Sequence, residues 1–298
     1  MEYNSLPDIN GLATLKAVVE LGGVTEAARV LHVGQPAVTK RLRGLDLCYG
    51  TPLMRRIGHR LELTEAGKMV YTYACLVLDH QSALQDDLQQ LTSGQNKLRL
   101  GVTLAIGEHF LPDLLLRFAE RYPQHTIESR VGYSRRIQQR LATGFYDLAL
   151  LEQAPDHPRI LVQKWLDDEL MLVCGAGHPL WGCEMIAVTE LVGLKYVLRE
   201  PEAATRITLD QALKDIELGP LPIVMEVGST DTIVEILQSG RYVSFLPRFV
   251  VDDAPLVGGL HHIKIQGLRI NRTLWIALNR DNLNNTVADA FIQLLWNK

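Results

Sequence analysis

Seven basic residues gather in a short part of this 298-residue chain, although the chain as a whole is acidic. Residues 29–60 hold seven Lys and Arg against one acid, Asp46, while the net charge of the whole chain is −4. Basic side chains at this density bind phosphate groups through a local field, even on an acidic protein. A solvated surface face is the alternative interpretation. The basic residues are Arg29, Lys40, Arg41, Arg43, Arg55, Arg56 and Arg60.

A second group of polar residues stands where strands are expected to end or helices to begin. Thr103 ends an expected strand, Thr205 and Arg206 open one helix, and Ser229 and Thr230 open another. Helix N-termini present free N–H groups and a partial positive charge, which favour an anionic or carbonyl-bearing ligand. Simple capping of these helices, with Arg206 exposed, is the alternative.

Residues able to catalyse or to bind metal are present but match no known motif. The chain has no GxSxG, HExxH or Walker loop, and no GxGxxG after a strand. The adjacent His261 and His262 would point to opposite faces of a strand, so they do not easily share a metal ion. Cys174 and Cys183 are candidates for a redox pair, but one buried thiol and one loop thiol are the simpler interpretation. We therefore expect no enzyme, no metal and no cofactor.

The first 66 residues predict short helices that present the basic group. Helical periodicity up to Gly22 predicts a first helix, and Thr25 is expected to cap a second. A third is expected from about Gln35, with Pro36 in its first turn. Residues 52–63 predict a β-hairpin with a basic tip. Two short helices, the second basic, followed by such a hairpin are typical of a winged helix-turn-helix that binds DNA.

A long helix is expected next, capped by Thr64. About 28 residues at 1.5 Å rise would span about 42 Å, which is too long for so small a domain to cover. Its apolar residues recur at alternating steps of four and three, as in a dimeric coiled coil. Burial against the C-terminal domain of the same chain is the alternative. The residues expected to dimerise are Val70, Ala74, Val77, Gln81, Leu84, Leu88 and Leu91.

From Lys97 onward, expected strands and helices alternate to the C-terminus. Repeated β–α–β units imply mostly parallel sheets with helices on both faces, and ligand sites at the carboxyl ends of the strands. No stretch reaches the ~18 consecutive apolar residues of a membrane span. The N-terminus lacks the basic and apolar regions of an export signal, and the four cysteines lie far apart. We therefore expect a cytoplasmic protein with reduced thiols.

An ordered pattern in the N-terminal third carries a family resemblance. Its residues are Leu12, Leu15, Val18-Val19-Glu20, Gly23, Thr25-Glu26-Ala27-Ala28-Arg29-Val30-Leu31, Gln35-Pro36-Ala37-Val38-Thr39, Leu42, Leu45-Asp46, Gly50-Thr51-Pro52-Leu53, Arg56, Leu63-Thr64 and Ala66-Gly67. In order and spacing over about 55 residues, this pattern resembles the LysR-type transcriptional regulators. The chain departs from the family at Gly34, where a serine is usual, which removes a helix cap or phosphate contact but no basic group.

The C-terminal part resembles the effector domain of the CbbR-like subgroup of that family. The matching segments are 98–108 with Leu111-Pro112, 165–170, 198–200 with Thr205-Arg206, and 227–230. The resemblance implies two α/β subdomains of the periplasmic-binding-protein type with an effector cleft between them. It also implies that the chain crosses between them near 166–168 and returns near 266–268.

One departure from the subgroup concerns the expected ligand. Glu202, Ala203 and Ala204 stand where the subgroup has Gly-Ser-Gly, a turn whose N–H groups bind an anion. We therefore expect Glu202 to select against simple inorganic anions. The expected effector is a small polar molecule that carries both charges, such as an amino acid, unless Glu202 points to solvent.

The residues expected to contact DNA lie at the start of the second and third helices and on the hairpin. They are Thr25, Gln35, Pro36, Val38, Thr39, Lys40, Arg41, Arg43, Arg55, Arg56, His59 and Arg60. The residues expected to contact the effector lie at strand ends and helix starts. They are Thr103, Ala105, Ser134, Glu202, Thr205, Arg206, Ser229 and Thr230.

Together these features predict an α/β protein with an N-terminal winged helix-turn-helix, a long linker helix and a two-subdomain, periplasmic-binding-protein-like effector domain. The expected bounds are 1–66, 67–94 and 95–298, with subdomains at about 95–166 plus 268–298 and at about 167–267. The predicted function is a sequence-specific transcriptional regulator whose dimer or tetramer binds inverted-repeat promoter DNA and responds to a small-molecule effector. RNA polymerase is a further candidate partner, and no membrane is expected.

Two other function classes stay open. One is a solute-binding or enzymatic α/β protein with an N-terminal extension. The other is a constitutive DNA-binding protein whose cleft is vestigial. The effector, the target genes and the direction of regulation do not follow from the sequence.

Overall fold

The computed structural model describes residues 6–57, 60–93, 97–253, 259–282 and 285–296. The chain divides into two units, Met1–Ser93 and Gly94–Lys298, each with hydrophobic cores of its own. No described helix is long and apolar enough to cross a membrane.

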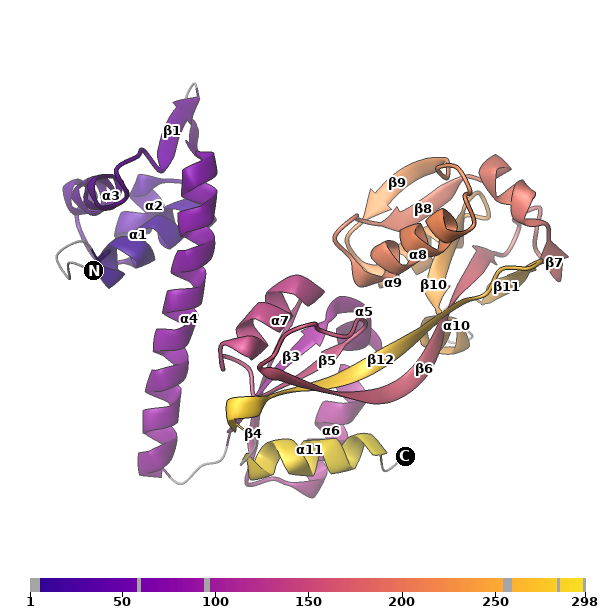
Figure 1. The fold of residues 1–298 in the computed structure, drawn as a ribbon. Coiled ribbons are helices and arrows are strands. Elements are labelled where there is room, and N and C mark those ends of the chain that lie inside the picture. The colour runs from indigo at the N-terminus through magenta and orange to yellow at the C-terminus, as the bar shows by residue number, and fades with distance from the viewer. Residues whose placement is uncertain (1–5, 58–59, 94–96, 254–258, 283–284, 297–298) are drawn as a thin grey trace. The chain divides into compact units, whose positions relative to one another are not determined.

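The first unit contains four helices and one hairpin in its described part (Figure 1). They are α1 (Ile9–Glu20), α2 (Val24–Val30), α3 (Gln35–Tyr49), β1 (Met54–Ile57), β2 (Arg60–Leu63) and α4 (Glu65–Ser93). Leucines of α1 and α3 pack with Leu53 and the first turns of α4 to form the core. The predicted winged helix-turn-helix elements are therefore all present.

Local sequence explains where these helices begin and end. Pro36 lies in the first turn of α3, as predicted, and Gly50 ends that helix with a left-handed φ of 66°. The Gly67 N–H donates to Thr64 Oγ1 at 3.0 Å, so Thr64 caps α4 as predicted. Thr25 does not cap α2, because that helix begins one residue earlier, after Gly23.

Helix α4 has two parts with different surroundings. Val70 and Ala74 are buried in the core of the first unit, and Val77 packs against the same core. Leu84 and Leu88, farther along the helix, are 53% and 54% exposed. The sequence analysis placed all of these on one dimer seam, but α1 and α3 cover its beginning. Periodicity gives the apolar face of a helix without saying what covers it.

The second unit contains ten strands, seven α-helices and two short 3-10 helices in its described part. In chain order they are β3 (Lys97–Thr103), α5 (Leu104–His109), α6 (Leu111–Arg121), β4 (Thr126–Gly132), α7 (Ser134–Ala142), β5 (Leu148–Leu151), β6 (Ile160–Gly175), β7 (Met185–Ile186), η2 (Val188–Gly193), β8 (Tyr196–Arg199), α8 (Ala204–Asp215), β9 (Ile223–Val227), α9 (Thr230–Leu237), β10 (Val243–Pro247), α10 (Arg248–Asp253), β11 (Leu260–Ile265), β12 (Ile270–Asn279), η4 (Arg280–Asn282) and α11 (Thr286–Trp296).

The strands form a mixed sheet with the order β4-β3-β5-β12-β6-β10-β8-β9, and β11 also pairs with β6. Strands β4, β3 and β5 are mutually parallel, as are β9, β8 and β10. Strands β6 and β12 run antiparallel to each other, and each is also antiparallel to a parallel group. The expectation of mostly parallel strands therefore holds within each group but not for the two long strands that join them (Figure 1).

The two long strands belong to two cores. Trp165 of β6 and Leu274 of β12 pack in the first core, with β3, β5, α6 and α11. Leu170 of β6 and Ile270 of β12 pack in the second, with β8, β10 and α8. We call these halves the first and second subdomains. Because Ile270 pairs with Leu170, both strands cross together, and the return lies at 270–274 rather than at 266–268.

Candidate functional site

Helix α3 presents a polar face at its N-terminal end. Gln35, Thr39 and Arg43 recur every four residues and are exposed, as are Pro36 and Lys40. This spacing places them along one side of the helix. The face therefore has the hydrogen-bonding and basic groups with which a recognition helix reads base edges and binds phosphates.

Val38 does not belong to that face. Its side chain is fully buried and packs with Val18, Ala27 and Ala28, between α3 and the two preceding helices. Its predicted contact with DNA is therefore corrected to a place in the core. The start of α3 was predicted to contact DNA, but Val38 lies on the apolar side of this helix.

A hydrogen bond ties α2 to the start of α3. Gln35 Nε2 donates to Thr25 Oγ1 at 3.1 Å, and Thr39 Oγ1 donates to the Gln35 carbonyl oxygen at 3.1 Å. Thr25 is exposed beside these residues. The contact brings together three residues that the sequence analysis expected at DNA, and it restrains the Gln35 side chain.

The hairpin adds a second basic element. Strands β1 and β2 pair antiparallel, and Arg55 and Arg56 are exposed on β1. His59 and the side chain of Arg60 lie outside the described residues. Within the described part of the chain, Arg55, Arg56 and the basic residues of α3 (Lys40, Arg41 and Arg43) form no ion pair. Their charges are free to bind phosphate groups.

The later part of α4 is the candidate surface for self-association. Leu84 and Leu88 lie four residues apart and are about half exposed, and Gln81 is exposed one turn earlier. The side chain of Leu91 lies outside the described ones. Two exposed leucines on one helix face are consistent with a seam, which stays a prediction.

In the second unit, a buried ionic network joins the long strands to the start of α8. The Arg272 guanidinium donates from Nε to Asp168 Oδ2 at 2.6 Å and from Nη1 to Glu152 Oε1 at 2.7 Å. Thr205 also donates its hydroxyl to Glu152 Oε1, at 3.2 Å. The charged side chains are only 3–4% exposed, so solvent screens them weakly. Thr205 of the second subdomain is thereby bound to Glu152 of the first.

The start of α9 meets another carboxylate of the first subdomain. Ser229 Oγ donates to Glu108 Oε1 at 3.1 Å, and the Thr230 N–H donates to Glu108 Oε2 at 3.3 Å. A helix N-terminus is favourable for negative charge. Glu108 therefore occupies the place where the sequence analysis expected a group of the ligand.

Arg199 and Glu200 lie next to the start of α9. We call these residues, together with Glu108, Glu152, Asp168, Thr205, Ser229, Thr230 and Arg272, the junction between the subdomains. Arg199 Nη1 donates to Thr230 Oγ1 at 3.3 Å, while its Nε and Nη2 each bond Glu200 at 2.8 Å. Burial disfavours the charged form of Glu200, but the hydrogen bonds from Arg199 outweigh it and lower the pKa of Glu200. The Glu200 carboxyl is therefore ionised at neutral pH.

Among the described residues, two that were expected at the effector, Glu202 and Arg206, form no hydrogen bond with Glu108 or Glu152. Glu202 is exposed, which was the alternative that the sequence left open. Arg206 bonds Asp210 at 2.9 Å, Glu226 at 3.1 Å and the Arg199 carbonyl oxygen at 2.9 Å. The position of Arg206 in the first turn of α8 turns its long side chain toward β9, away from Glu152.

Three other expected effector residues are buried. Thr103 ends β3, as predicted, and its Oγ1 has no hydrogen-bond partner among the described residues. The Ala105 side chain is fully buried in α5, and its contact with a ligand stays a prediction. Ser134 opens α7, and its Oγ accepts a hydrogen bond from Gln138 Nε2 at 2.9 Å. Thr103 is the one of the three with a free polar atom.

The sequence analysis missed the three residues that organise the junction: Glu108, Glu152 and Arg272. Glu152 directly follows the apolar strand β5, and the carboxyl end of a parallel strand is where such folds place sites. The position of Glu152 in the sequence could therefore have predicted it as a site residue. Glu108 lies in α5, a six-residue helix that was not predicted. Arg272 is an isolated charge in an apolar strand, which also indicates a buried partner.

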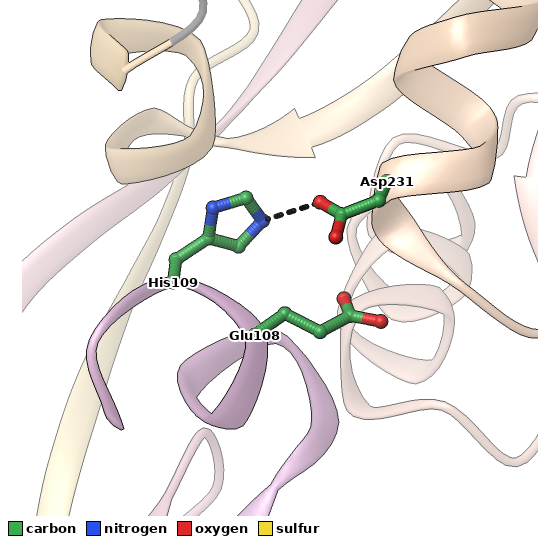
Figure 2. Close-up of side chains that lie close together, drawn as sticks. All are labelled: Glu108, His109 and Asp231. Atoms are coloured by element: carbon green, nitrogen blue, oxygen red, sulfur yellow. Dashed lines mark ion pairs between the residues drawn. The ribbon is translucent and has the colours of Figure 1, made fainter. Parts of the chain in front are cut away.

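One cluster at the junction has the donor types of a metal site. Glu108 and His109 of α5 lie opposite Asp231 of α9, and His109 Nε2 is 3.5 Å from Asp231 Oδ1 (Figure 2). One ligand atom from each of the three residues lies within 4.8 Å of the others. His261 and His262 do not form such a cluster: His261 contacts the Cys183 carbonyl oxygen, at 2.7 Å.

Comparison with known proteins bears on both units. Residues 9–68 match the family described as bacterial regulatory helix-turn-helix protein, lysR family, and residues 92–298 match the LysR substrate binding domain. The chain is 30% identical over 295 residues to a probable RuBisCO transcriptional regulator of Trichormus variabilis. That alignment covers 96% of this chain and 86% of the relative.

Solved structures share the fold. The crystal structure of CbnR, a LysR family transcriptional regulator, aligns with a TM-score of 0.70 at 19% identity, covering 97% of this chain and 98% of that one. The regulatory domain of CcmR from Synechocystis PCC6803, solved in complex with 2-PG, aligns with a TM-score of 0.61 at 23% identity. It covers 67% of this chain and 95% of its own.

Proposed function

Because the chain belongs to the LysR family of transcriptional regulators, with that family's DNA-binding and effector-binding domains, we propose that its effector carries a positively charged group. The effector would bind where the two subdomains meet. The resemblance to the CbbR-like subgroup is confirmed, since relatives are named as RuBisCO transcriptional regulators. The following proposals concern how this chain reads DNA and what it senses.

We propose that α3 reads base edges through Gln35 and Thr39, while Lys40, Arg43 and the hairpin arginines hold the phosphates. Gln35, Thr39, Lys40 and Arg43 are exposed on α3, and Arg55 and Arg56 are exposed on β1. A dimer through the later part of α4 would place two such helices on DNA with two-fold symmetry. Selection from a random duplex pool should then enrich an inverted repeat, and enrichment of a single unrepeated site would contradict the dimeric arrangement.

One observation supports the charge of the effector: carboxylates of the chain itself accept hydrogen bonds from the first residues of both helices at the junction. Glu152 accepts from Thr205 of α8, and Glu108 accepts from Ser229 and the Thr230 N–H of α9. These positions would otherwise attract an anion. A simple anion from solution would have to displace one of these carboxylates. Because the carboxylate is part of the chain, it loses less entropy on binding than a free anion does.

The balance of charge at the junction favours a cationic group. The hydrogen bonds described above join four carboxylates there, those of Glu108, Glu152, Asp168 and Glu200, and Asp231 lies beside them. They contact two guanidinium groups, those of Arg199 and Arg272. The excess of negative charge is partly buried, so an ammonium group would be stabilised by it. Thr103 Oγ1 supplies a free polar atom for a neutral part of the ligand.

Pairs of ligands that differ by one amino group test this proposal. We expect aspartate and alanine to raise the melting temperature of the full chain more than succinate and propionate do, because ligands that bind the native state stabilise it. Glu152→Gln should reduce this preference, whereas Glu120→Gln, an exposed glutamate of α6, should not. Equal stabilisation by both members of each pair would refute the charge argument.

If no ligand of any charge raised the melting temperature, a constitutive regulator with a vestigial cleft would be favoured instead.

We further propose that the protein is not an enzyme and works in the cytoplasm, without a resident cofactor. None of the four cysteines is in a disulfide, which supports a reducing compartment. RNA polymerase is proposed as a partner because the protein regulates transcription.

A further inference from the structure

Three side chains of metal-binding type converge where α5 of the first subdomain meets α9 of the second (Figure 2). Glu108 and His109 end α5, and Asp231 is the second residue of α9. We propose that they form a site for a divalent first-row transition metal ion that links the two subdomains. The inference rests on the proposed function in one respect, since Glu108 also belongs to the junction that binds the effector.

The imidazole of His109 is the strongest indication of a metal. Its Nε2 is buried and has no hydrogen-bond partner among the described residues, although it faces Asp231 Oδ1 at 3.5 Å. A buried ring nitrogen without a partner loses the hydrogen bond that water would give it. A metal ion would satisfy its lone pair. The ring packs against Phe249 with a centroid distance of 5.8 Å, which limits its rotation.

The carboxylate of Glu108 is already oriented by neighbours. Its two oxygens accept hydrogen bonds from Ser229 Oγ at 3.1 Å and from the Thr230 N–H at 3.3 Å. Metal-binding carboxylates are held by outer hydrogen bonds of this kind, and an oxygen that accepts one bond keeps a lone pair for the ion. Asp231 is 66% exposed, so a hydrated ion has access from solvent.

The donor set selects the class of ion. One imidazole nitrogen and two carboxylate oxygens suit Zn²⁺, Co²⁺ and similar ions, whereas Ca²⁺ and Mg²⁺ prefer oxygen donors alone. Zinc binds these donors at about 2.0–2.2 Å, so the ligand atoms, now within 4.8 Å of one another, need only small side-chain movements. Three protein ligands leave a coordination position open for water.

The charge also fits a divalent ion. Glu108 and Asp231 bring two negative charges into one small space, and an imidazole that binds a metal ion is neutral. Arg199 does not neutralise them fully, because two of its nitrogens bond Glu200. An ion of charge +2 would balance the pair and join α5 to α9. Because its ligands come from both subdomains, its binding stabilises the contact between α5 and α9.

Calorimetric titration of ZnCl₂ into the full-length protein tests the site, using protein free of a histidine tag and stripped with chelator. We expect one Zn²⁺ per chain in the wild type. His109→Ala and Asp231→Asn should each weaken binding by at least about tenfold. Asp113→Asn is the matched control, because Asp113 is 70% exposed and pairs with one basic residue at 3.4 Å, much as Asp231 does at 3.5 Å. It should leave the affinity unchanged.

Co²⁺ gives a second readout that does not depend on stability. The Co²⁺-loaded wild type should show visible absorption bands that His109→Ala lacks, since the imidazole would be a direct ligand. Absence of stoichiometric binding, or the same Zn²⁺ affinity in wild type and His109→Ala, would overturn the proposal. The ligand-pair experiment is run in chelator, so it tests the charge of the effector independently of the metal site.

Discussion

Arg272 is the residue whose loss should most weaken the junction. Its guanidinium is 3% exposed and bonds Asp168 at 2.6 Å and Glu152 at 2.7 Å. Arg272→Met keeps most of the side-chain volume but leaves two buried carboxylates without their partner. Removing one member of a buried ion pair costs about 3–5 kcal/mol. For a unit of this size, that corresponds to a fall in melting temperature of roughly 6–20 °C.

The same substitution at an exposed ion pair provides the control. Arg159 and Asp281 lie 3.6 Å apart with side chains 62% and 65% exposed. Arg159→Met should therefore cost no more than about 1 kcal/mol. Differential scanning calorimetry of the full chain measures both variants. Adding Glu152→Gln and Asp168→Asn to Arg272→Met should recover part of the loss, because no buried charge would then lack a partner. Equal melting temperatures for Arg272→Met and Arg159→Met would refute the role given to the buried network.

Three further predictions concern DNA binding, assembly and thiol chemistry. Arg56→Ala should weaken binding to all DNA sequences alike and reduce the slope of log affinity against log salt concentration by about one. Thr39→Ala should instead relax the base preference. Fluorescence anisotropy at several salt concentrations separates these effects. The double variant Leu84→Asp/Leu88→Asp should sediment as a smaller species, whereas Gln85→Asp, a charge at an exposed position of the same helix, should leave the assembly intact. Burial, with a smaller contribution from Cys183, raises the pKa of Cys174 to about 11. At pH 8 its thiol is therefore almost entirely protonated, and mass spectrometry should find it alkylated far more slowly than Cys48, with a rate that rises as the pH approaches 11.

Local patterns predicted most of the first unit. The helix start at Pro36, the cap at Thr64 and the hairpin depend on neighbours in sequence, so a sequence shows them directly. The burial of Val70 and Ala74 was not predicted, because it depends on α1 and α3 packing against α4. Val38 was predicted at DNA, but it is buried because three helices pack around it.

At the junction of the second unit, the sequence predicted only one partner of each contact. Thr205, Ser229 and Thr230 stand at helix starts, which sequence patterns indicate. Their partners Glu108 and Glu152 lie 121 and 53 residues away along the chain from Ser229 and Thr205, respectively. Such pairs follow from the way β6 and β12 cross, which no local pattern contains. Glu202, the acid that was predicted at the effector, lies close to Thr205 in the sequence but is exposed.

The contact between Glu108 and the start of α9 can be measured directly by hydrogen–deuterium exchange. The first N–H groups of a helix have no partner within the helix, so protection of the Thr230 N–H would come from Glu108. We expect that Glu108→Ala speeds exchange in the peptide covering 229–232 by about tenfold, because a hydrogen bond to a charged group is lost. Glu120→Ala should leave that exchange unchanged. The same exchange rate in wild type and Glu108→Ala would contradict the claim that the chain's own carboxylates hold the two subdomains together.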